Sequence, residues 1–152
     1  MGKPARILVV DDDENIRNTM NAILADEGYT VDLASSGSEA ISKTKETVYN
    51  VALIDVRLPD MEGVELLTSM RDAVPRTRKI MVTGYPSMQN AIAALNKSAD
   101  AYLIKPVDLE KLLATIREQL QLQEKERKFT EQKVADFIEA RVREISTTRV
   151  LL

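Results

Sequence analysis

Four short, uninterrupted apolar runs constrain the fold of this chain more than any other feature of its sequence. They span residues 7–10, 51–54, 80–82 and 102–104. Continuous apolar runs of this length are typical of strands that are buried on both faces, as in parallel sheets. A fifth segment, residues 30–34, alternates apolar and polar residues and predicts an edge strand with one wet face.

Helical signals fill the stretches between and after these strands. Ser36 and Glu39 have the spacing of a capping box, Gly28 and Pro75 are typical of helix ends, and Asp108 can cap a last helix. The capping box predicts a helix near 37–46, and four other segments show helical spacing: Ile16, Met20, Ile23 and Leu24; Val64, Leu67 and Met70; Met88, Ile92 and Leu95; Leu109, Leu112, Leu113, Ile116 and Leu120. Because strands alternate with helices, we expect an α/β fold, a doubly wound five-stranded parallel sheet with five helices.

The end of the chain differs in character. We expect residues 1–120 to form the α/β domain and residues 121–152 to form a helical extension or linker, because no Gly or Pro follows Pro106. The extension either continues the fifth helix or adds a short second one. Its apolar stripe, which could pack within one chain or form a dimer seam, consists of Val134, Phe137, Ile138, Val142 and Ile145.

Composition excludes several kinds of chemistry. The chain has no cysteine and no histidine, so it has no disulfide, no Cys/His zinc site and no Ser-His-Asp triad. A net charge of −3 argues against general nucleic-acid binding. The first apolar run is too short for a signal peptide or membrane span, so we expect a cytoplasmic protein without membrane contact.

Polar side chains stand where four of the predicted strands end. Residues 11–13 are three aspartates, and Asp55, Thr83 and Lys105 follow or end the later strands. In an open α/β sheet these positions meet at the ligand-binding edge. Clustered carboxylates favour Mg²⁺, a carboxylate can act as a nucleophile, and lysine and threonine can contact phosphoryl oxygens. This set predicts a site that holds a phosphoryl group on an aspartate.

Longer motifs around these positions resemble a known family. The chain is similar to the response-regulator receiver domains of two-component signalling, over residues 5–120. The matching stretches are ILVVDD at 7–12, ALIDVRLPDMEG at 52–63, VTGY at 82–85 and AYLIKP at 101–106. The resemblance implies the flavodoxin-like strand order 2-1-3-4-5.

The resemblance also implies a role for each acidic residue. Asp55 matches the phosphoacceptor, and Asp11 and Asp12 match the acidic pair around Mg²⁺. Asp55 also contacts the metal, and Arg57 matches the residue whose backbone carbonyl binds it. Asp13 and Asn15 are read as candidates for capping the first helix rather than as ligands, and Asp13 is the stronger of the two.

Three further positions match residues that respond to phosphorylation. Lys105 matches the lysine that contacts the phosphoryl group. Thr83 matches the residue with the switch hydroxyl, and Tyr102 matches the aromatic residue that moves together with that hydroxyl. The Lys105–Pro106 bond is often cis in the family. The loops around the site are shaped by Pro59, Gly63, Gly84 and Pro106.

The implied function is a switch rather than a turnover enzyme. Asp55 would take its phosphoryl group from a histidine kinase or a histidine-phosphotransfer protein, with only Mg-assisted self-phosphorylation and dephosphorylation by the domain. The output would pass through the face of helix four, strand five and helix five, or through the tail, with a homodimer as one form. We expect no direct nucleic-acid binding.

Two other functions remain open from the residues. An aspartyl-phosphate phosphatase would use an Asp-x-Asp-x-Thr motif, whereas here Asp11-x-Asp13 is followed by Asn15. A degenerate receiver could act only as a constitutive dimerisation module. The chain is either part of a longer regulator or a stand-alone one.

Overall fold

One parallel sheet organises the molecule. The structure is a computed structural model that describes residues 2–70, 75–84, 87, 93 and 99–151, with side chains described as far as Ser146. Its strands lie in the order β2-β1-β3-β4-β5, so the predicted doubly wound, flavodoxin-like sheet is confirmed. The strands are β1 Arg6–Val10, β2 Thr30–Ala34, β3 Val51–Asp55, β4 Arg78–Thr83 and β5 Ala101–Ile104.

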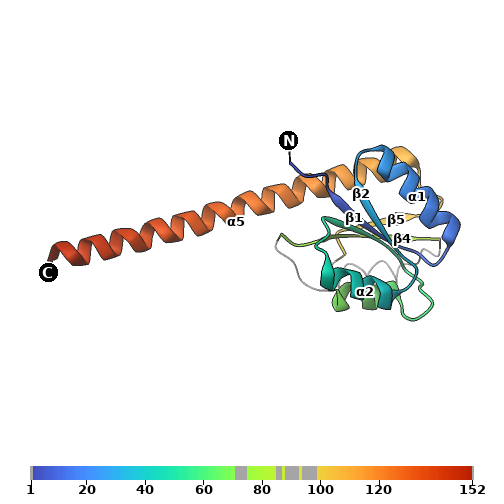
Figure 1. Ribbon diagram of the computed structural model, residues 1–152, viewed down its shortest axis with the longest axis horizontal. Coiled ribbons are helices and arrows are strands. Elements are labelled where there is room, and N and C mark those ends of the chain that lie inside the picture. The colour runs from blue at the N-terminus through green and yellow to red at the C-terminus, as the bar shows by residue number, and fades with distance from the viewer. Residues whose placement is uncertain (1, 71–74, 85–86, 88–92, 94–98, 152) are drawn as a thin grey trace.

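Helices cover both faces of this sheet (Figure 1). The described residues contain α1 Glu14–Asp26, α2 Gly37–Glu46, α3 Gly63–Ser69 and α5 Leu109–Leu151. The predicted helix on Met88, Ile92 and Leu95 lies outside the described residues, so the count of five helices is not confirmed. Helix α3 ends at Ser69, earlier than the predicted stop at Pro75, because Met70 is extended.

The strands β1, β3 and β4 are buried on both faces because their side chains alternate between two cores. The edge strand β5 differs from what its apolar run predicted, because Ile104 is exposed and Tyr102 is only partly buried. Leu8 and Ile54 pack against α2 and α3, whereas Ile7 and Leu53 pack against α1 and α5. The outer strand β2 is only partly buried, as its alternating sequence predicted. Truncating a core side chain such as Ile54 to alanine is expected to cost about 2–5 kcal/mol.

Helix α1 is held by local signals that the sequence shows. Asp13 is its N-cap, and Asp13 Oδ1 accepts hydrogen bonds from the backbone N–H groups of Asn15 (2.9 Å) and Ile16 (3.3 Å). The helix ends before Gly28, whose φ of 93° lies in the left-handed region that favours glycine. Both predictions for this helix, the Asp13 cap and the Gly28 stop, are confirmed.

Helix α5 runs unbroken from the sheet into a long projection (Figure 1). Leu112 and Ile116 are buried against the sheet, and contacts with the sheet domain continue past residue 120. Gln123 Nε2 donates to the backbone oxygens of Asn50 (3.0 Å) and Arg76 (2.8 Å), and its Oε1 accepts from Asn50 Nδ2 (2.9 Å). These three hydrogen bonds anchor the start of the projection to the sheet domain.

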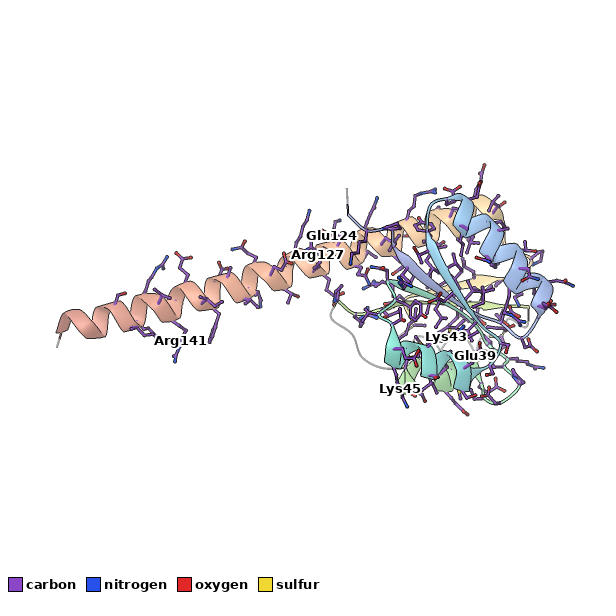
Figure 2. The ribbon with its side chains drawn as sticks, viewed as in Figure 1. Glu39, Lys43, Lys45, Glu124, Arg127 and Arg141 are labelled. Carbon is purple, nitrogen blue, oxygen red and sulfur yellow. The ribbon has the colours of Figure 1, made fainter. Side chains whose placement is uncertain are left out.

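One further contact follows, between Glu126 and Arg78 of β4 (3.4 Å), and beyond it the helix lies in solvent. Every side chain from 128 to 146 is exposed. Figure 2 shows Glu124, Arg127 and Arg141 along this part of α5. Arg127 pairs with Glu124 one turn before it and with Glu131 one turn after it, the latter at 2.5 Å. Along the described chain, no helix combines the length and the hydropathy that a bilayer span requires.

Candidate functional site

The carboxyl ends of the strands bring the predicted polar residues together. Asp11 directly follows β1, Asp55 and Thr83 are the last residues of β3 and β4, and Lys105 directly follows β5. The parallel register makes these ends neighbours at one edge of the sheet. Residues far apart in the sequence therefore share one small region.

Lys105 joins the two central strands at this edge. Its ammonium Nζ donates to Asp11 Oδ2 (2.8 Å) and to Asp55 Oδ2 (3.0 Å). Its backbone N–H donates to the carbonyl oxygen of Thr83 (2.7 Å), and its bond to Pro106 is cis. The lysine is thus tethered at both ends, by its backbone to β4 and by its charge to two buried carboxylates.

Three carboxylates form a group that could hold a metal ion. Asp11, Asp12 and Asp55 each offer one oxygen, and these oxygens lie within 4.8 Å of one another. Asp11 and Asp55 are buried and Asp12 is exposed, so the group opens to solvent on one side. A donor set made only of carboxylate oxygens fits a hard divalent cation such as Mg²⁺.

Burial and charge set the ionisation of the central pair. Burial raises the pKa of Asp55 above its usual value, and the nearby charge of Asp11 adds to the rise. The Arg57 N–H and Lys105 oppose this change without cancelling it. For Lys105, burial works against the charged form, but hydrogen bonds and charges from Asp11 and Asp55 outweigh it and raise the pKa.

The loop after β3 is packed against the backbone of Asp55. The N–H of Arg57 donates to Asp55 Oδ1 (3.1 Å), and the N–H of Gly63 donates to the oxygen of Val56 (2.6 Å). A Cβ added at Gly63 would lie 2.1 Å from the Asp55 carbonyl oxygen. Only glycine fits there, so Gly63 lets the loop that contains Pro59 close behind the carboxylate.

The same loop reaches the start of α2. Asp60 Oδ1 and Oδ2 accept hydrogen bonds from the N–H groups of Gly37 (2.8 Å) and Ser38 (2.9 Å). These bonds, first to Ser38 and then to Gly37, lower the pKa of Asp60. Sequence reasoning missed this cap, since the carboxylate comes from a segment more than twenty residues away. The local signal, Ser36, does accept from the N–H of Glu39 (3.2 Å), as predicted.

One half of the predicted capping box differs in detail. Glu39 Oε2 accepts from the N–H of Ser35 (2.9 Å) and from its hydroxyl (2.9 Å), one residue before the N-cap Ser36. The bonds to Ser35 lower the pKa of Glu39. The spacing of the capping box was therefore a good predictor of the helix start, but not of the residue that Glu39 binds.

The two predicted switch residues lie on one face of the sheet. Thr83 is fully buried, and Tyr102 pairs in register with Met81, two residues before Thr83. Tyr102 packs against the core beneath α2 and α3. Its hydroxyl is buried and, within the described part of the chain, has no hydrogen-bond partner. Next to Thr83, a Cβ added at Gly84 would lie 3.9 Å from the Lys105 side chain, an ordinary contact distance.

An apolar groove opens beside Lys105. It has a volume of about 530 Å³ and lies between α1 and the segment that leads from β5 into α5. Its lining residues are mainly apolar, among them Ile16, Met20, Ile23, Pro106, Val107 and Leu112. The charged residues of the site are therefore bordered on one side by an apolar groove.

Asp13 belongs to the helix cap rather than to this site. The carboxylate group that could hold a metal contains Asp11, Asp12 and Asp55, whereas Asp13 caps α1. The second aspartate of an Asp-x-Asp phosphatase motif is therefore engaged elsewhere. This geometry does not support the phosphatase alternative.

Comparisons with known proteins point to one family. The family model of the response regulator receiver domain matches residues 7–117. The transcriptional regulatory protein ZraR of Klebsiella oxytoca is 39% identical over 119 residues, which cover 78% of this chain and 27% of that relative. The chain spans about a quarter of the length of this and the next curated relatives it matches.

Solved structures agree with that match. A CheY-like response regulator receiver domain protein from Methanospirillum hungatei is 46% identical, with a TM-score of 0.77, and covers 81% of this chain and 98% of that one. A response regulator from Burkholderia pseudomallei is 28% identical, with a TM-score of 0.68, and covers 80% of this chain and 72% of that one. That second structure contains a phosphorylated aspartic acid and a calcium ion.

Proposed function

The chain belongs to the response regulator receiver domain family, and on that premise we propose that Asp55 accepts a phosphoryl group and thereby switches the domain between two conformations. The observation that carries the proposal is the Lys105 ammonium, which lies 3.0 Å from Asp55 and 2.8 Å from Asp11 at the ligand-binding edge. A phosphoryl group on Asp55 would find a cation already in place.

Mg²⁺ is the cofactor that the carboxylate group fits. Asp11, Asp12 and Asp55 would hold it, together with the backbone carbonyl of Arg57. When bound it would neutralise charge that develops on the phosphoryl oxygens. The repulsion between Asp11 and Asp55 favours the protonated form of Asp55, and a bound Mg²⁺ would offset that repulsion.

The transfer itself needs little from the protein beyond position and charge. A carboxylate oxygen of Asp55 forms a bond to phosphorus while the bond from phosphorus to the donor breaks, and the donor leaves with the electron pair. Lys105 then turns from the carboxylates to a phosphoryl oxygen. The buried position of Asp55 limits the access of water to the acyl phosphate that results.

Thr83 and Tyr102 would carry the change away from the site. The Thr83 hydroxyl would donate to a phosphoryl oxygen and leave its former position. Tyr102 lies on the same face of the sheet, and its buried hydroxyl would respond to the vacated space. This is a population shift between two packings, which phosphorylation biases.

The phosphodonor would be a protein with a phosphohistidine, a histidine kinase or a histidine-phosphotransfer protein. The chain has no histidine of its own to relay the group. The groove between α1 and α5, next to Lys105, is an apolar surface on which such a donor could dock. On the other side of Lys105, Gly84 has no side chain and so leaves room for a donor to approach.

The remaining roles concern the whole chain. We assign the receiver to residues 1–120 and a linker or readout role to residues 121–152. A homodimer, through the face of the predicted fourth helix, β5 and α5 or through the tail, is one form that the output could take. A net charge of −3 supports the proposal that this chain contacts no nucleic acid directly. Within the receiver we expect Mg-assisted self-phosphorylation and dephosphorylation, in a cytoplasmic setting.

A mass measurement tests the central claim. The protein is incubated with acetyl phosphate and Mg²⁺ and weighed intact, and one added phosphoryl group is expected. Asp55→Asn should abolish the adduct, whereas Asp60→Asn, a matched change at a nearby exposed carboxylate, should retain it. An adduct that persists in Asp55→Asn would overturn the assignment, and rapid multiple turnover of a phosphate ester would favour an enzyme instead.

A further inference from the structure

Arg17 of α1 contacts both ends of the loop that contains the first two carboxylates of the site. This loop, residues 11–13, leads from β1 into α1, and we call it the acidic loop. The guanidinium Nη1 of Arg17 donates to the backbone carbonyl oxygen of Asp11 (2.8 Å), and the backbone N–H of Arg17 donates to the carbonyl oxygen of Asp13 (3.0 Å). Asp12 therefore lies between two peptide groups that the same residue holds.

The two contacts have different origins. The bond from the Arg17 N–H to Asp13 is an ordinary hydrogen bond of the first turn of α1, so any residue except proline could make it. The bond from the guanidinium depends on the side chain. A helical side chain leans toward the N-terminus of its helix, so a long side chain at Arg17 can reach back to Asp11, six residues earlier. Because the donor is charged, this bond is stronger than one between neutral groups.

The Asp11 carbonyl is the point at which the chain leaves the sheet. The parallel register of β1 with its neighbours ends at Val10, and the Asp11 N–H still donates to the carbonyl oxygen of Ala34 (3.1 Å). For the Asp11 carbonyl, the Arg17 guanidinium supplies the donor that a neighbouring strand supplies inside a sheet. The orientation of the peptide group between Asp11 and Asp12 therefore depends on Arg17.

Asp12 is the carboxylate that depends most on this arrangement. Asp11 and Asp55 are buried, and both accept a hydrogen bond from Lys105. Asp12 is exposed, so burial does not hold its side chain. The place of the Asp12 carboxylate is therefore set mainly by the backbone of the acidic loop.

We propose that Arg17 is a positioning residue for the metal site, because its bond to the Asp11 carbonyl orders the acidic loop with Asp12 beside Asp11 and Asp55. A loop that is already ordered loses less conformational entropy when it binds an ion, so the ion binds more tightly. The inference rests on the proposed function, since it takes Mg²⁺ to bind at these carboxylates. Arg17 acts through the backbone of the loop.

Charge alone predicts the opposite effect. A guanidinium close to a divalent cation repels it, so loss of the Arg17 charge would by itself tighten Mg²⁺ binding. Helix stability does not account for an arginine here either, because a cation near a helix N-terminus lies at the unfavourable end of the helix dipole. Positioning predicts weaker binding, so the sign of the change distinguishes the two roles.

A magnesium titration followed by backbone amide NMR tests the proposal. The dissociation constant is taken from the shifts of the Asp12 and Asp13 amide signals. Arg17→Met should raise this constant about tenfold, the lower end for loss of a group that orients a metal ligand. In the metal-free protein, fast motion of the Asp12 amide should also increase. Arg117→Met, the same change at an exposed position of α5, should alter neither quantity.

The same spectra show whether each variant is folded. Weaker Mg²⁺ binding by a fully folded Arg17→Met chain does not come from lost stability. If that variant does not fold, Arg17→Gln replaces it with the same expectation, because the glutamine side chain is too short to reach Asp11.

Other outcomes contradict the proposal. An unchanged or lower dissociation constant in the folded Arg17 variant would overturn it while leaving the metal site intact. Failure of the proposed metal site would look different, because Mg²⁺ would then leave the Asp12 and Asp13 signals of the native chain unshifted, and both claims would fall. The titration involves no phosphoryl group, so its result is independent of whether Asp55 is the phosphoacceptor.

Discussion

Gly63 lies directly against the backbone of Asp55: a Cβ at Gly63 would be 2.1 Å from the Asp55 carbonyl oxygen and 3.0 Å from its carbonyl carbon. The contact is with main chain at the end of a buried central strand, which cannot move aside as a flexible side chain can. The loop and the proposed phosphoacceptor are therefore fixed to one another.

Gly63→Ala is expected to displace Asp55 and to destabilise the fold by about 1–3 kcal/mol, the usual range for overpacking. Thermal or urea unfolding measures the loss, and phosphorylation by acetyl phosphate should slow sharply. Gly84→Ala is the matched control, because its added methyl would meet only the Lys105 side chain at 3.9 Å. Equal stability of the two variants would contradict the contact.

Asp55 should titrate above an ordinary aspartate in the metal-free protein, because burial raises its pKa. Carboxyl ¹³C NMR in a chelating buffer measures the midpoint. Lys105→Met should raise that midpoint further, since Lys105 opposes the rise, whereas Lys111→Met on the exposed start of α5 should not. A lower midpoint in Lys105→Met would be inconsistent with the ion pair.

The same titration has a consequence for stability. A carboxyl whose pKa is raised by folding contributes stability that is fully present below its unfolded pKa and lost as pH rises through the folded pKa. Without metal, this one group therefore makes the fold less stable at neutral pH than in mild acid. Mg²⁺ should reverse the effect at neutral pH by favouring the charged carboxylate.

Magnesium should raise the unfolding temperature. At a concentration one hundred times the dissociation constant, it should increase the free energy of unfolding by about 2.7 kcal/mol. Asp12→Asn should reduce this gain while changing the metal-free stability little, because Asp12 is exposed. Asp13→Asn is the matched control, since asparagine caps a helix as well as aspartate does. Loss of the gain in Asp13→Asn would place the metal elsewhere.

Gln123→Ala should loosen the start of the projection, because it removes three hydrogen bonds to Asn50 and Arg76. Leaving buried polar groups unsatisfied costs about 1–3 kcal/mol. Hydrogen exchange over residues 119–126 should accelerate, while exchange in β1 and β3 stays slow. Gln121→Ala, at an exposed neighbouring position, should change neither quantity.

Local patterns accounted for much of the fold. The apolar runs 7–10 and 51–54 became strands buried on both faces, and Asp13 and Gly28 mark the ends of α1 as expected. These features depend on burial and on hydrogen bonds within a few residues, which the order of residue types encodes directly.

The candidate site combined both kinds of information. Strand ends and the family motifs predicted that Asp11, Asp55 and Lys105 belong to one edge. The structure added that Lys105 contacts both carboxylates at once and that Asp12 alone of the acidic group is exposed. Distances between side chains from three different strands depend on register and packing, which no single segment encodes.

The sequence by itself determined which segments become strands and helices, because their apolar spacing specifies the faces that must leave water. Only the tertiary structure decided that Asp60 caps α2 and that Gln123 anchors α5 at the far edge of the sheet. It also decided that α5 continues through the polar segment 121–133 as one unbroken helix. Hydrogen bonds between distant segments, and the direction of a solvated helix, follow from how the whole chain packs.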